Sequence, residues 1–101
     1  MVRVIIERRC RPGKEAELET LLVELRTRAM RQLGYISGET LRGDTLRTVS
    51  DPSLWLVIST WIDADSWQKW QKVPERREIE SKIENLLVAP AEVTILRIAS
   101  R

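Results

Sequence analysis

Histidine is absent from this chain of 101 residues, and cysteine occurs once, at Cys10. The lack of histidine removes the commonest acid–base group at neutral pH and the usual zinc ligand sets. A single cysteine allows no intrachain disulfide, which argues against a secreted disulfide scaffold. No run approaches the roughly 18 apolar residues of a membrane span, and no apolar stretch near the N-terminus is typical of a signal peptide. We therefore expect a cytoplasmic protein with no metal and no membrane partner.

The composition describes one ordinary globular domain over residues 1–101. Apolar residues make up 43% and charged residues 32%, which excludes a disordered or fibrous chain. The formal charge is only +2, and cations alternate with glutamates, as in residues 14–17 and 75–78. Such alternation is typical of a solvated face. A nucleic-acid-binding protein gathers its cations on one surface, so we expect no nucleic-acid partner.

Apolar spacing predicts a strand and then a helix. Residues 2–10 alternate in polarity, and the buried side is expected to comprise Val2, Val4, Ile6 and Cys10. A proline–glycine pair at 12–13 supplies a turn. From Lys14 onward apolar residues recur at steps of three and four, which predicts a helix ending at Gly34. Its apolar stripe comprises Leu18, Leu21, Leu22, Leu25, Ala29 and Leu33.

Two further strands are expected next. Residues 35–49 predict a looser strand, with Gly38 and Gly43 as bulge or bend points. Residues 54–62 are aliphatic, aromatic or β-branched for the most part and carry no charge. A run of that kind is typical of a strand covered on both faces.

The last third predicts a helix in two pieces and a closing strand. Asp63 is expected to cap a short helix, and Pro74 to begin the next. Residues 93–98 form the final strand. The resulting order is that of a ferredoxin-like, split βαβ α+β fold, whose antiparallel sheet has its helices on one face. Because the strand at 54–62 is apolar on both sides, we expect a second copy to cover the other face.

With these elements in order, the chain resembles the antibiotic biosynthesis monooxygenase family of the dimeric α+β barrel superfamily. The resemblance covers almost the whole chain. It rests on residues 11–15 before the first helix, on residues 34–35 and 38–39 entering the second strand, and on Trp61. The pattern continues through Asp63, Trp67 and Trp70.

The resemblance implies a homodimeric α+β barrel with one pocket per protomer, between sheet and helices. Relatives include cofactor-free oxygenases that oxidise polycyclic phenols to quinones, and haem-degrading oxygenases. In the haem degraders a proximal histidine and an asparagine stand where this chain has Glu80 and Ile6. A carboxylate is not a usual haem ligand, so haem degradation is not expected. No cofactor is expected at all.

Three tryptophans are the candidate walls of a ligand pocket: Trp61, Trp67 and Trp70. Each is also a natural core residue, because aromatic side chains dominate the energetics of cores. The resemblance places Trp70 where the haem degraders have a pocket tryptophan and many other members have a histidine. Packing is the favoured interpretation for Trp61 and Trp67, whereas packing and ligand binding both stay open for Trp70.

Arg8 and Arg97 are the candidate partners of a phenolate. By parity, Arg8 shares the apolar side of the first strand, and Arg97 shares the side of the last strand that carries Val93 and Ile95. The alternative for both is an arginine at a strand end that reaches solvent. No residue is predicted to act as the catalytic acid or base.

Three functions are compatible with these features. The first is binding of a small, flat aromatic molecule, with cofactor-free oxidation of a phenol. The second is a non-catalytic ligand-binding or interaction module on the same dimer, suggested by the lack of an acid–base pair. The third is an isomerase or decarboxylase of a small aromatic or lactone, which needs a proton carrier that no residue clearly supplies.

Overall fold

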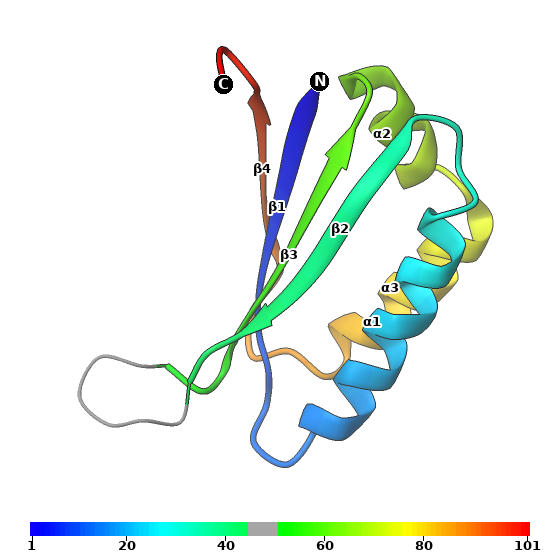
Figure 1. Ribbon diagram of the computed structural model, residues 1–101. Coiled ribbons are helices and arrows are strands. Elements are labelled where there is room, and N and C mark those ends of the chain that lie inside the picture. The colour runs from blue at the N-terminus through cyan, green and yellow to red at the C-terminus, as the bar shows by residue number, and fades with distance from the viewer. Residues whose placement is uncertain (45–50) are drawn as a thin grey trace.

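The computed structural model describes residues 1–44 and 51–101, which form an α+β fold of two layers (Figure 1). The strands are β1 (Val2–Arg9), β2 (Tyr35–Arg42), β3 (Leu54–Trp61) and β4 (Glu92–Arg97). The helices are α1 (Glu15–Ala29), α2 (Ala64–Gln71) and α3 (Pro74–Glu84). The strands pair antiparallel in the order β2-β3-β1-β4, and all three helices lie on one face of the sheet. This is the ferredoxin-like arrangement that the sequence predicts.

Strand β1 follows the predicted alternation. Its even-numbered residues are buried beneath the helices, whereas its odd-numbered residues are exposed or half-buried. Arg8 continues the buried side and is only 1% exposed. Cys10 lies just beyond the strand and forms an isolated bridge with Leu87, which carries the buried side past the strand end.

Helix α1 ends at Ala29, earlier than predicted. Backbone bonds from residues 31 and 32 to carbonyls three positions back tighten the chain there. Leu33, which we expected in the buried stripe, is 93% exposed. Gly34 does not cap the helix: its φ of +89° and its carbonyl, which accepts the Ile62 N–H at 2.7 Å, lead the chain into β2. The helix was predicted too long because Leu33 continues the apolar spacing of the helix, although it lies beyond the last helical turn.

Strand β2 is shorter than the predicted strand over 35–49, whose residues 45–49 lie outside the described residues. The irregularity in its pairing falls between Tyr35 and Ser37, not at Gly38. Gly38 instead leaves room for an aromatic side chain, because a Cβ there would lie 2.6 Å from the hydroxyl of Tyr35. Strand β3 occupies the predicted apolar run.

The two helix starts of the last third are confirmed. Asp63 accepts hydrogen bonds from the backbone N–H of Ser66 at 2.8 Å and from its hydroxyl at 2.7 Å. This capping satisfies donors that the first turn of α2 leaves unpaired. Pro74 occupies the first turn of α3. The break between α2 and α3 lets both segments turn an apolar side toward the sheet, with Trp67 and Trp70 buried on α2.

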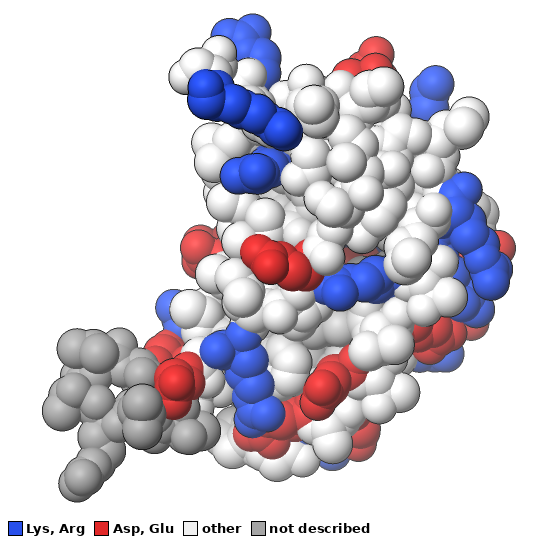
Figure 2. All heavy atoms as spheres, viewed as in Figure 1, with Lys and Arg blue, Asp and Glu red and all other residues white. Residues whose placement is uncertain are grey.

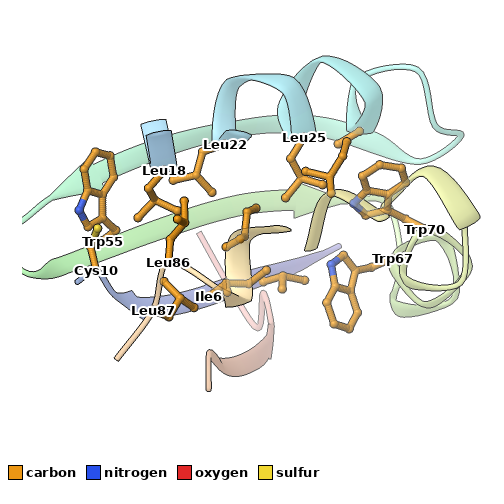
Figure 3. Close-up of a cluster of buried hydrophobic side chains, with 14 of the residues drawn as sticks. Ile6, Cys10, Leu18, Leu22, Leu25, Trp55, Trp67, Trp70, Leu86 and Leu87 are labelled. Carbon is orange, nitrogen blue, oxygen red and sulfur yellow. The ribbon is translucent and has the colours of Figure 1, made fainter. Parts of the chain in front are cut away.

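The core lies between the helices and the sheet (Figure 3). Trp67 and Trp70 stand at one end of it and Trp55 stands at the other. The opposite sheet face bears none of the described helices. On that face Leu41 is 43% exposed and Leu96 is 50% exposed.

The surface is mixed in charge. On the face shown in Figure 2, basic and acidic side chains are intermingled with large uncharged areas. No helix in residues 1–44 and 51–101 is long and apolar enough to cross a membrane.

Candidate functional site

A pocket lies between the sheet and the helices at the end of the core that holds Trp67 and Trp70. Strands β1, β2 and β3 form its floor, and α1, α2 and the start of α3 form its walls. The pocket is partly open to solvent, and its free volume of about 40 Å³ is room for a few water molecules. Its aromatic lining comprises Tyr35, Trp61, Trp67 and Trp70, and its charged lining comprises Arg8, Arg26 and Arg76.

Four of the five residues singled out from the sequence meet at this pocket. Trp61, Trp67, Trp70 and Arg8 all line it. Arg97 does not: it is exposed on the edge strand β4, opposite Val2 in the register. It does share a sheet face with Arg8, as parity predicts, but the helices do not cover β4.

The indole of Trp61 is held in place from two sides. Its Nε1 donates a hydrogen bond to the hydroxyl of Ser59 at 2.9 Å. The ring of Tyr35 meets it edge-on, with centroids 5.3 Å apart and an interplanar angle of 89°. A T-shaped pair of this kind adds about 0.5–1.5 kcal/mol beyond area burial. Trp61 therefore offers a rigid aromatic surface to the pocket.

Arg8, Glu80 and Arg76 form a buried charge cluster beside the aromatic walls. Nη2 of Arg8 donates to Oε1 of Glu80 at 2.5 Å, and Nη2 of Arg76 donates to the same oxygen at 3.3 Å. Burial lowers the pKa of Arg8 from its ordinary value, while the attraction and hydrogen bond of Glu80 oppose that change. Burial also lowers the pKa of Arg76, with Glu80 raising it and Arg8 lowering it further. Both guanidinium groups stay charged at neutral pH.

Arg76 and Arg26 line the site although the sequence did not single them out. Arg76 belongs to the alternating charges at 75–78, which predicted a solvated face, yet it is only 9% exposed. The spacing along the helix could have indicated this burial. Arg76 and Glu80 lie on the same side of α3 as the buried Ile79 and Ile83. In the sequence, Arg26 is only a cation near a helix end. It reaches across to β2, where its Nη2 donates to the hydroxyl of Thr40 at 2.8 Å.

Tyr35 keeps its phenolic proton at neutral pH and is therefore no base. Burial raises the pKa of its hydroxyl, and the nearby Arg26 only partly offsets that rise. No described group of three cysteine, aspartate or glutamate side chains is placed to hold a metal ion. The chemistry that this pocket offers is therefore aromatic contact, guanidinium charge and one phenol.

Comparisons with known proteins agree with this architecture. The family model described as "Antibiotic biosynthesis monooxygenase" matches residues 1–82. No curated protein sequence matches the chain.

Among solved structures, the chain is similar to a mutant of SnoaB, a cofactor-independent oxygenase from Streptomyces nogalater. The TM-score is 0.85 and the sequence identity is 17%, and the match covers 99% of this chain and 94% of that one. Rv0793 from Mycobacterium tuberculosis has a TM-score of 0.84 and 19% identity, over 99% and 96%. A conserved protein from Methanosarcina mazei Go1 has a TM-score of 0.84 and 20% identity, over 95% and 90%. At these identities the likeness establishes the fold alone.

Proposed function

The chain belongs to the antibiotic biosynthesis monooxygenase family, and on that premise we propose that it binds a small, flat phenol in the pocket at Trp70 and oxidises it with molecular oxygen. The observation that carries the proposal is the lining of that pocket, where four aromatic side chains stand beside three guanidinium groups. Concave sites lined by rings and a few converging polar groups are the usual form of small-molecule sites.

The oxidation needs no metal or organic cofactor in its overall balance. A phenol with an unsubstituted ring carbon reacts with one O₂ to give a quinone and one water. One oxygen atom enters the ring, and the other leaves with the two hydrogens that the phenol loses. Ionisation of the phenol makes the ring a better electron donor, and a positive charge beside its oxygen favours the ionised form. Arg8 and Arg26 both supply such a charge to the pocket.

The pocket must widen to admit a two-ring phenol. Its space of about 40 Å³ compares with the roughly 150 Å³ cavity that is known to hold benzene. Among the described residues, Thr40 is the hydrogen-bond partner of the half-buried Arg26 side chain, at 2.8 Å. Rotation of that side chain opens the pocket at low cost, because the charged head can exchange the hydroxyl for water.

Oxygen uptake with a polycyclic phenol tests the proposal. The protein is incubated with 1-naphthol in air and under nitrogen, while oxygen and quinone absorbance are followed. We expect oxygen and quinone to change one for one in air, with no quinone under nitrogen. If naphthol binds and no oxygen is consumed, oxidation is ruled out and the non-catalytic binding module is the better description. If no aromatic ligand binds, the site itself is wrong.

A matched pair of tryptophan variants locates the site. Trp70 and Trp55 are 4% and 3% exposed, and they stand at opposite ends of the core. Only Trp70 lines the pocket, so Trp70→Phe should weaken naphthol binding while Trp55→Phe leaves it unchanged. Equal effects of the two variants would indicate a change in the core rather than in a site.

We also propose that two chains associate through the helix-free face of the sheet. That face exposes Leu41 and Leu96, and β3 adds Leu56 and Ile58 between them. It carries charges of both signs, with Arg3 on β1 and Glu39 on β2 both exposed on this face and β3 between them. A twofold partner can therefore set each cation against an anion of the other copy.

A further inference from the structure

We propose that the ligand of this pocket bears a carboxylate, which Arg8 and Arg76 bind. The inference rests on the proposed phenol site and names the class of molecule that the site selects: a hydroxylated aromatic carboxylate. Arg26, the third arginine of the lining, then serves the phenolic oxygen.

The charge of the pocket wall has one sign. The charged side chains among the described residues that line the pocket are Arg8, Arg26 and Arg76. Glu80 neutralises only part of this charge. It is shared by Arg8 and Arg76 through a single oxygen, so the cluster of two guanidinium groups and one carboxylate keeps a net positive charge. A buried net charge is costly unless a counter-charge arrives.

The two arginines also keep donors that no described residue satisfies. Nε and Nη1 of Arg8 and Nε of Arg76 are buried and have no hydrogen-bond partner among the described residues. Arg8 is only 1% exposed, so bulk water does not reach its Nε and Nη1. Buried donors without partners cost free energy and are rare in native proteins, so these nitrogens are ready to bind an acceptor such as a water, an ion or a ligand group.

A carboxylate meets this demand better than a neutral group or a lone phenolate. It supplies one negative charge, which matches the net charge of the cluster, and two oxygens that accept several hydrogen bonds. A phenolate offers the charge with only one oxygen, and an amide offers no charge. Because Arg8 and Arg76 bond the same oxygen of Glu80, their guanidinium groups are close enough to serve one acceptor group together.

Binding of three matched two-ring probes tests the inference. The probes are 2-naphthoate, the neutral isostere 2-naphthamide, and 2-naphthol, titrated at pH 7.5 against tryptophan fluorescence. We expect the wild-type protein to bind the naphthoate about ten- to a hundredfold more tightly than the naphthamide. Arg8→Gln should abolish most of that preference. Arg97→Gln, on an exposed arginine of the same sheet face outside the pocket, should retain it.

The outcomes separate this inference from the proposed function. Equal affinity of the wild-type protein for naphthoate and naphthamide overturns the carboxylate while leaving an aromatic site in place. If ionised naphthol at alkaline pH binds as tightly as the naphthoate, a phenolate alone satisfies the cluster and the carboxylate is again wrong. If none of the probes binds, both the proposed aromatic site and its proposed preference for a carboxylate are refuted. The wild-type comparison decides the matter even if Arg8→Gln does not fold, and Arg76→Gln provides the second variant.

Discussion

Arg8 and Glu80 are 72 positions apart in the chain, and their side chains meet at 2.5 Å where β1 lies beneath α3. The pair therefore joins the first strand to the third helix inside the core. Since Arg76 also bonds Glu80, one carboxylate is the counter-charge of two buried cations. Glu80 therefore compensates only part of the buried charge, and the pocket keeps a net positive charge.

Replacing the shared carboxylate tests that relationship. Glu80→Gln leaves two buried arginines without a counter-charge, so the free energy of unfolding should fall by about 3–5 kcal/mol. Denaturant unfolding measures this, with Glu78→Gln, at an exposed position of α3, as the control. Naphthoate should raise the melting temperature of Glu80→Gln more than that of the wild type. A stability loss no larger than that of Glu78→Gln would show that the cluster is effectively hydrated.

The contact between Gly38 and Tyr35 predicts a strong coupling. A Cβ at position 38 would lie 2.6 Å from the tyrosine hydroxyl, so Gly38→Ala should displace the ring from Trp61 and cost about 1–3 kcal/mol. In a Tyr35→Phe background the same change should cost less, because the clashing oxygen is gone. A double-mutant cycle in urea measures the difference. Strictly additive effects would contradict the predicted contact.

Two glycines with positive φ form a matched pair. Gly13 has a φ of +84° and an added Cβ would meet nothing within 4 Å. Gly34 has a φ of +89°, and its Cβ would lie 2.5 Å from Cβ of Ser66 and 2.9 Å from Cγ2 of Ile62. Gly13→Ala should cost about 1–2 kcal/mol for the left-handed backbone alone. Gly34→Ala should cost about 1–3 kcal/mol more, because it also overpacks the start of α2. Equal melting temperatures for the two variants would refute this.

The cap of α2 predicts a change of stability with acid. Hydrogen bonds from the side chain and backbone of Ser66 hold the pKa of Asp63 below its ordinary value. The cap's stabilisation is thus fully present above the unfolded pKa of about 3.9 and is lost as the pH falls through the lower folded pKa. Asp63→Asn should lose less stability than the wild type over that acid range in urea titrations. Identical pH profiles of the two proteins would show that ionised Asp63 does not stabilise the fold.

Association through the helix-free sheet face predicts a dimer in solution. Ile58 lies on that face, since it pairs with Ile5 on β1 and Glu39 on β2. The wild type should sediment as a dimer at micromolar concentration, whereas Ile58→Lys should sediment as a folded monomer. A wild-type monomer under these conditions would refute the proposed association.

The order of strands and helices along the chain and the placement of Arg8 could be predicted because they depend on local periodicity. Alternation in β1 is a property of neighbouring residues, and it correctly placed Arg8 on the buried side. The end of α1 could not be read the same way. Leu33 continues the spacing of the stripe, but the chain has already turned toward β2, and only the tertiary path decides that.

The charge cluster escaped prediction for a different reason. Nothing in the local sequence says that Glu80 faces Arg8, because that contact depends on how α3 crosses β1. Arg76 lies among alternating charges, which usually face solvent, but on the helix it is on the same side as the buried Ile79 and Ile83. Arg97 was placed on the right face, but the extent of helix cover over β4 is a property of the whole fold.

A crystal structure of the wild-type protein soaked with 1-hydroxy-2-naphthoate would show whether the pocket binds a hydroxylated aromatic carboxylate through Arg8. We expect the rings to lie against Trp70 and Trp61, with the carboxylate within hydrogen-bond distance of Nε and Nη1 of Arg8, which have no partner among the described residues. Ligand density on the outer sheet face, or in the pocket with the carboxylate turned away from Arg8, would contradict it.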